Sequence, residues 1–171
     1  MNTKKIALTD KFEYIKSDLY RYYGKVTLKN FLKAMLRNKS FKYQFWMRMC
    51  QIGGICKIIA RPIYELKKGS NIQIDYRTKI GYGLYIAHGG PIVVNPSAVI
   101  GNNCNLSQYT TIGSNDGHAA VLGDNVYIGP NVCLVEDVVI GNNVTIGAGS
   151  VVTKNIPDNA TAVGNYAKVV N

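Results

Sequence analysis

A branched apolar residue returns every six residues through the second half of the chain. The first register comprises Ile74, Ile80, Ile86 and Ile92. A slip of two residues begins a second register at Val94, Ile100, Leu106 and Ile112, and after an irregular stretch the step resumes at Leu122, Ile128, Leu134, Ile140, Ile146 and Val152. A step of six fits neither the 3.6-residue period of a helix nor the plain alternation of a strand. It is typical of a parallel β-helix, in which each rung buries its apolar side only against its neighbours.

The turns between these anchors have a pattern of their own. Gly directly follows seven of the anchors, and the pairs Asn102-Asn103 and Asn142-Asn143 fall at two further turns. We expect these residues to supply the positive φ angles of tight turns. The ordinary strands of a sandwich would show plain alternation and irregular turn spacing, so the solenoid is the preferred interpretation.

The region before the solenoid has helical patterns. Thr27 is a candidate N-cap for a short helix through Leu36. A second pattern runs from about Phe41 to Leu66, with apolar residues near i, i+3, i+4 and i+7 spacing. Gly53-Gly54 is expected to weaken or kink this helix, and Pro62 to end or bend it.

Two regions follow from these patterns. Residues 1–70 form a basic α-helical region, and Lys67-Lys68-Gly69-Ser70 is the expected joint. Residues 71–171 form the β-helix, with a loop at 114–121 and a C-terminal closing segment in which Pro157 fits a final turn. The predicted fold is therefore mainly β, a parallel β-helix with an N-terminal helical region.

The excess positive charge lies entirely outside the predicted solenoid. Residues 1–70 hold 16 Lys and Arg against 4 Asp and Glu, and residues 71–171 hold 4 against 6. The basic helices have two compatible uses: they cap the open first rung, or they contact an anionic membrane or glycan. Nucleic acid is not an expected partner, because no recognition motif accompanies the charge.

The chain shows no sign of secretion or membrane insertion. Its first residues lack the apolar stretch of a signal peptide, and no apolar run reaches the ~18 residues of a spanning helix. The four cysteines show neither a dense framework nor paired metal spacing, so we expect reduced thiols and no metal. The expected location is cytoplasmic, with peripheral contact at the inner membrane surface as an option.

Both histidines lie where the repeat is irregular. His88 precedes Gly89-Gly90-Pro91 at the register slip, and His118 lies inside the loop. Insertions in repeat proteins tend to cluster on one functional face. The two histidines are therefore the main candidates for chemistry.

The chain resembles the left-handed β-helix acyltransferases, the hexapeptide-repeat family. The apolar-Gly hexads and the ending IGAGSVVTKNIPDNATAVGNYAKVV carry the likeness, which extends from about Ile72 to Val170. The segments IQIDYRTKIGYGLYIAH and DGHAAVLGD are most similar to the serine acetyltransferase branch. The left hand of the helix is implied by this resemblance and not by the six-residue period.

The resemblance also implies roles for individual residues. His88 matches the general base, Asp75 the carboxylate that pairs with it, and His118 the histidine of the protruding loop. Acetyl-CoA is the implied co-substrate, and the family packs as a homotrimer with sites between subunits. The implied contacts to CoA are the backbone of Gly129, Gly147 and Ala148, with Lys154 and Lys168 as candidates for binding its phosphates. Pro130 stands where the serine acetyltransferases offer a backbone N–H to CoA, so that contact is lost or shifted by one residue.

Two departures from the serine acetyltransferases bear on the acceptor. An Asp before the catalytic histidine and an Arg before the loop histidine hold the amino acid in that branch, and Ala87 and Gly117 occupy those places here. The segment IAHGGPIVVN is instead similar to the IxHxGxIVxN pattern of enzymes that O-acetylate sugars of capsular or exopolysaccharides. We therefore expect an acetyl-CoA-dependent O-acetyltransferase acting on a sugar hydroxyl of a polysaccharide or its precursor.

The chemistry that these residues suit is direct attack on the thioester. A neutral imidazole accepts the proton of the acceptor hydroxyl as attack proceeds, and no covalent enzyme intermediate is needed. The alternative acceptor is serine, as in serine O-acetyltransferase of cysteine biosynthesis. Two other classes remain: a β-helical carbonic anhydrase, which needs three histidines on zinc where this chain has two, and a non-catalytic scaffold.

Overall fold

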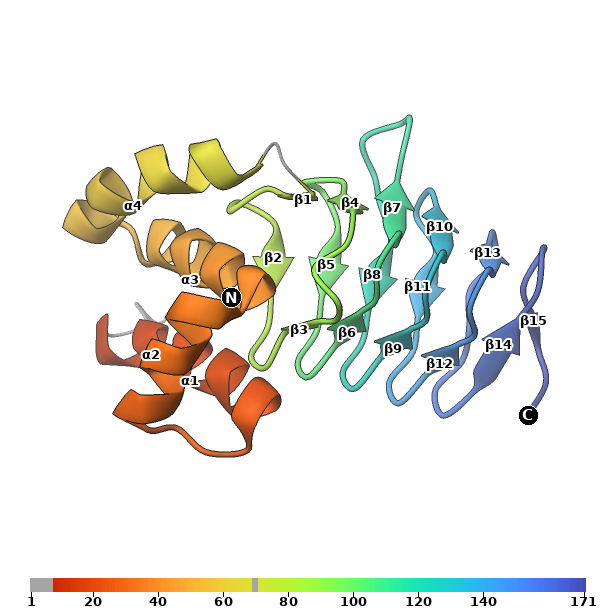
Figure 1. The fold of residues 1–171 in the computed structure, drawn as a ribbon. Helices are drawn as coiled ribbons and strands as arrows, with labels where there is room; N and C mark the ends of the chain where they lie inside the picture. Colours follow the sequence, from red (N-terminus) through yellow and green to blue (C-terminus); the bar gives the residue numbers. More distant parts are fainter. Residues whose placement is uncertain (1–7, 69–70) are drawn as a thin grey trace.

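The computed structural model describes residues 8–68 and 71–171, in which helices at one end precede a solenoid of short strands (Figure 1). The helices are α1 (Leu8–Tyr23), α2 (Leu28–Arg37), α3 (Lys39–Ile52) and α4 (Gly54–Lys68). The expected joint falls partly on residues 69 and 70, which lie outside the described residues. The division of the chain at residue 70 stays a prediction.

The strands form three sheets, one along each side of the coil. Sheet A contains β1 (Ile72–Ile74), β4 (Ile92–Val94), β7 (Thr111–Gly113), β10 (Cys133–Val135) and β13 (Val151–Val152). Sheet B contains β2 (Lys79–Ile80), β5 (Val99–Ile100), β8 (Val121–Leu122) and β11 (Val139–Ile140). Sheet C contains β3 (Tyr85–Ile86), β6 (Asn105–Leu106), β9 (Tyr127–Ile128), β12 (Thr145–Ile146), β14 (Thr161–Val163) and β15 (Lys168–Val169). Neighbouring strands are parallel except β14 and β15, which close sheet C antiparallel. The predicted fold class, a left-handed parallel β-helix after helices, is confirmed.

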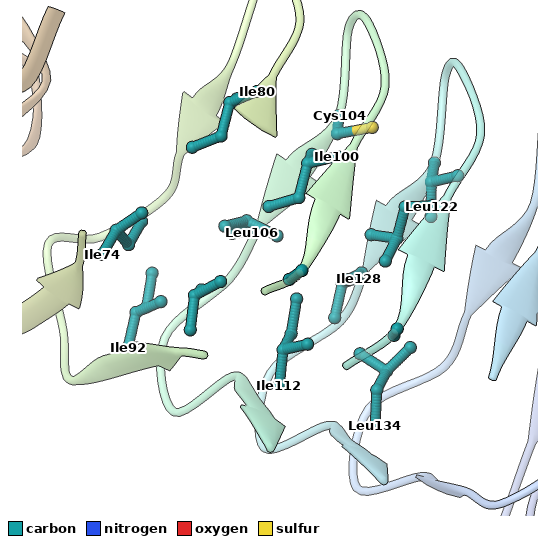
Figure 2. Packing of buried hydrophobic residues seen from close by; sticks show 14 of the residues in the cluster. Ile74, Ile80, Ile92, Ile100, Cys104, Leu106, Ile112, Leu122, Ile128 and Leu134 are labelled. Carbon is teal, nitrogen blue, oxygen red and sulfur yellow. The ribbon is translucent and has the colours of Figure 1, made fainter. Parts of the chain in front are cut away.

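The hexad anchors form the core of the solenoid. Val94 pairs with Ile74 on one side and with Ile112 on the other, and Ile112 pairs with Leu134. These four side chains are at most 3% exposed. Figure 2 shows Ile74, Ile112 and Leu134 pointing into the coil. At ~25 cal/mol per Å² of buried apolar surface, this continuous column is the main stabilising term of the solenoid.

The corners between sheets line up as three edges. The AB edge, from sheet A to sheet B, comprises residues 75–78, 95–98, 114–120, 136–138 and 153–155. The BC edge comprises residues 81–84, 101–104, 123–126 and 141–144. The CA edge, from sheet C to the next strand of sheet A, comprises residues 87–91, 107–110, 129–132 and 147–150.

The glycines that follow the anchors have a different role from the one predicted. Gly81 and Gly101 on the BC edge do not adopt positive φ. Instead, a Cβ on Gly81 would lie 2.8 Å from the carbonyl oxygen of Gly101, so the stacked backbones leave no space for a side chain. Asn103 and Asn143 adopt φ of 56° and 57°, so the second residue of each Asn pair supplies the left-handed turn, as expected.

The helical region is tied to the first coil by buried polar contacts. Ile74 accepts hydrogen bonds at its carbonyl from Tyr43 and Tyr64, both at 2.7 Å. The buried Arg48 bonds to Asp18 of α1 and also donates to the carbonyl of Gly81 at 2.7 Å. The predicted capping of the first rung by the helices is therefore observed at this end.

The helices differ from the prediction in three respects. Helix α1 was not predicted from its polar and basic sequence. The single pattern from Phe41 to Leu66 is two helices separated at Gly53, whose φ is 84°. Pro62 lies inside α4 and is exposed, so water can bind the carbonyl that its missing N–H leaves without a partner.

Candidate functional site

The corner that carries His88 is an insertion into the regular coil. Ile86 and Val94 are eight residues apart, whereas Leu106 and Ile112 span the same corner in six. His88 is exposed and adopts φ 58°, and Gly89 follows it with φ 59°. The two-residue register slip in the sequence is therefore the extra length that makes this left-handed corner project.

Side chains from the helices hold the strand that leads to His88. The Tyr22 hydroxyl accepts a hydrogen bond from the Ile86 N–H at 3.1 Å and donates to Gln44 Oε1 at 2.5 Å. Ser40 lies against Gly89, where an added Cβ would be 3.2 Å from its hydroxyl. These contacts were not predictable, because Tyr22 and Ile86 are separated by 64 residues.

Asp75 lies on the AB edge and is bound by basic side chains. Its carboxylate accepts hydrogen bonds from the backbone and guanidinium of Arg77, at 2.8 to 3.0 Å, and from Lys68 at 3.3 Å. The hydrogen bonds from Arg77 hold the pKa of Asp75 well below its usual range. The Asp-x-Arg spacing is the local signal in the sequence for this pair, which was not among the predicted contacts.

The predicted pairing of Asp75 with His88 is not formed within the chain. No hydrogen bond joins these two residues in the part of the chain that the structure describes. The physical reason is the period: 13 residues correspond to two sides of the coil, so Asp75 lies on the AB edge and His88 on the CA edge. A residue on the same edge as His88 must be about one whole coil away.

The loop that carries His118 is the second insertion. Ile112 and Leu122 are ten residues apart, against six between Leu134 and Ile140 on the same edge. The loop is anchored at both ends: Ser114 donates to Glu136 at 3.0 Å, and the Ala119 N–H donates to Ser97 at 3.0 Å. His118 itself is exposed. It lies on the AB edge, so His88 and His118 flank sheet A from opposite sides.

Three of the five residues predicted to bind CoA share the CA edge with His88. A Cβ on Gly129 would lie 2.8 Å from the backbone nitrogen of Ala148, and a Cβ on Gly147 would meet Val163 at 2.7 Å. Ala148 is exposed. Lys168 pairs with Val163 across β14 and β15, where sheet C meets this edge, whereas Lys154 is exposed on the AB edge.

A cavity of about 750 Å³ lies away from both histidines, between α3, the start of α4 and sheet B. Its lining includes Arg48, Lys57, Tyr76 and Lys79. The candidate chemistry therefore lies on open edges and not in this cavity. Within residues 8–68 and 71–171 no cluster of three or more metal-ligating side chains occurs, and no helix there has the length and hydrophobicity to cross a membrane.

Comparison with known proteins gives a consistent result. Residues 119–154 match the family model described as bacterial transferase hexapeptide (six repeats). The chain is 40% identical to serine acetyltransferase 3, mitochondrial, of Arabidopsis thaliana over 121 residues, which are 67% of this chain and 30% of that protein. It is 39% identical over 115 residues to the putative colanic acid biosynthesis acetyltransferase WcaB of Escherichia coli, covering 66% of this chain and 70% of WcaB. The chain thus spans less than a third of the first relative and most of the second.

Solved structures agree with the sequence comparison. Serine acetyltransferase of Neisseria gonorrhoeae in complex with serine superimposes with a TM-score of 0.80 at 28% identity, over 94% of this chain and 69% of that one. A serine acetyltransferase in complex with CoA has a TM-score of 0.78 at 23% identity over 95% of this chain and 70% of that one, a likeness of fold.

Proposed function

This chain belongs to the bacterial transferase hexapeptide family, and we propose that it is an acetyl-CoA-dependent O-acetyltransferase whose acceptor is a sugar hydroxyl. The observation that carries the proposal is the placement of the two insertions. From Ile74 to Val152 the step of six is broken at two corners, and each longer corner presents one of the two histidines of the chain. A purely structural solenoid has no need of either.

In this proposal His88 is the general base. Its imidazole accepts the proton of the acceptor hydroxyl as the oxygen attacks the acetyl carbonyl carbon. The tetrahedral intermediate then collapses and its carbon–sulfur bond breaks. The CoA sulfur takes the proton from the His88 imidazolium, so CoA leaves as a thiol, the acetyl ester is the product and the imidazole is neutral again. His118 orients the acceptor or donates to the developing oxyanion. In this proposal Asp75 pairs with His88 only across a contact between subunits, since the two residues lie on different edges of one chain. Within its own chain Arg77 and Lys68 bind the carboxylate.

The proposed active assembly is a homotrimer. His88 and His118 lie on opposite edges of sheet A in one chain, so subunits packed side by side bring the CA edge of one to the AB edge of the next. A site between subunits then contains one histidine from each. On this arrangement CoA follows the CA edge past Gly129, Gly147 and Ala148, and Lys154 and Lys168 are the candidates for its phosphates.

The nature of the acceptor rests on two positions beside the histidines. Ala87 and Gly117 carry no charge, so a serine ammonium and carboxylate would lack charge-assisted partners worth about 1.5–3 kcal/mol each. Similarity to WcaB supports a glycan acceptor, and similarity to the serine acetyltransferases supports serine as the alternative.

The test is release of CoA from acetyl-CoA with serine and with a panel of sugar acceptors. We expect turnover with a sugar and weak turnover with serine; robust serine turnover would overturn the choice of acceptor. His88→Gln should lower kcat by about 10²- to 10⁴-fold. Asn103→Asp is the control, because it occupies a left-handed corner on the BC edge and should retain activity. Unchanged transfer by His88→Gln would remove the catalytic assignment.

A further inference from the structure

Helix α2 presents an apolar stripe to solvent. Leu28, Leu32 and Leu36 are 74%, 51% and 76% exposed, and their i, i+4, i+8 spacing places them in one line along the helix. This line is not the packing face. A different side of the helix packs in the core of the helical region, through the fully buried Ala34 and the partly buried Phe31 and Met35.

A basic stripe runs beside the leucines. Each leucine is directly followed by an exposed cation, and these three residues are Lys29, Lys33 and Arg37. Successive residues of a helix are separated by about 100°, so the two stripes are adjacent and parallel. The surroundings reinforce the charge: residues 19–64 contain ten Lys and Arg and no Asp or Glu, and of the ten only Arg48 is buried, where it is paired with an acidic residue from outside this range, Asp18.

We propose that this face of α2 binds the surface of an anionic membrane. A helix lying in the interface plane buries an apolar stripe among the acyl chains while its lysines and arginines meet the lipid phosphates. The ten residues of α2 span about 15 Å, so the helix lies on the bilayer and does not cross it. The proposal adds a binding site to the proposed function and does not depend on it.

The chemistry of the two stripes distinguishes this occupant from others. Nucleic acid or an acidic glycan would satisfy the cations and leave three leucines in water. A second copy of the chain packed on the same face would bury the leucines but bring two basic stripes together, at a cost from like-charge repulsion. An anionic bilayer satisfies both stripes at once.

The experiment is co-sedimentation of the full chain with vesicles of phosphatidylcholine alone and of phosphatidylcholine mixed with phosphatidylglycerol. We expect binding to the mixed vesicles only, weakening as salt is raised. Replacing Lys29, Lys33 and Arg37 together by Gln should weaken it about a hundredfold, from roughly fivefold per basic residue. Leu28→Ser with Leu36→Ser should abolish vesicle binding, because the cations alone do not sustain it.

The matched control is on α4, where Ile55 and Ile58 are 67% and 70% exposed. Ile55→Ser with Ile58→Ser removes a similar apolar area and should leave vesicle binding unchanged. Equal loss in the α4 variant, or no binding to anionic vesicles by the parent chain, would overturn the proposal. Sedimentation velocity without lipid is the second readout: a smaller assembly for the Leu28 and Leu36 variant would assign the face to a second copy instead. Release of CoA with a soluble acceptor, measured on the same variants, reports separately on the proposed function.

Discussion

Replacing Arg48 with Met should weaken the attachment of the helices to the first coil. Arg48 is 1% exposed, and its guanidinium bonds to both carboxylate oxygens of Asp18, at 2.9 and 3.2 Å. It also donates to the carbonyls of Ile80 and Gly81 at 3.0 and 2.7 Å. One side chain of α3 thereby joins α1 to the turn that begins the BC edge.

The expected cost follows from what the substitution leaves behind. In Arg48→Met the Asp18 carboxylate stays buried and keeps the N–H of Leu84 at 2.8 Å, but it loses its counter-charge. Removing one partner of a buried ion pair costs about 3–5 kcal/mol. Combining Asp18→Leu with Arg48→Met removes both charges and leaves neutral backbone groups without partners. The double variant should therefore be less destabilised than the sum of the two single variants, by about 2–3 kcal/mol.

The assay is urea denaturation followed by far-ultraviolet circular dichroism, with all four proteins at one protein concentration because assembly contributes to apparent stability. Near-ultraviolet signal from the tyrosines of α1 and α3 checks that both regions unfold together. A cost below about 1 kcal/mol for Arg48→Met, or strict additivity in the cycle, would refute the reasoning that this pair is the joint between helices and solenoid.

Three further predictions concern single residues of the solenoid. Hydrogen bonds from Arg77 lower the pKa of Asp75 below its ordinary 3.8, so the carboxylate stabilises the fold above about pH 4, and this stabilisation is lost as pH falls through the lowered pKa. The Tm of Asp75→Asn should therefore fall less steeply with acid than the Tm of the parent chain. An identical dependence of Tm on pH in the two proteins would contradict this. Gly129→Ala should lower the free energy of unfolding by about 1–3 kcal/mol, since its Cβ would lie 2.8 Å from the backbone nitrogen of Ala148. An unchanged free energy of unfolding in urea denaturation would show that the backbone of the CA edge moves to make room for the methyl group. Burial raises the pKa of Cys104 to about 11, so its alkylation by iodoacetamide at mildly alkaline pH should require unfolding. Rapid modification of the native protein, measured by mass spectrometry, would contradict the burial of this thiol inside the solenoid.

The solenoid was predictable because its interactions repeat. Ile100, for example, pairs with Ile80 and Leu122 in the adjacent coils, so the same apolar requirement recurs at each step of six. The left-handed turns followed from Asn103 and Asn143 for the same reason. The glycines were assigned the wrong cause, since the contact that forbids a Cβ on Gly81 comes from the next coil.

The helical region and the site were less accessible. In α1 the structure shows Ile15, Asp18 and Leu19 buried. The partner of the Asp18 carboxylate, Arg48, is 30 residues away, and no local sequence pattern predicts such a pair. The exposure of Ile55 and Ile58 likewise depends on how α4 turns after Gly53. Both histidines were identified by their irregular spacing, but their assignment to opposite edges required the count of sides around the coil.

The stacking of corners has a consequence for ligand length. Parallel strands are spaced by about 4.8 Å, so His88 in the first coil and Ala148 in the fourth are separated by about 14 Å along the axis. The number of coils between these two residues therefore sets the length of any extended molecule that contacts both of them along the CA edge. Inserting or deleting one complete coil between them would change the measured length by a single step while every corner kept its shape.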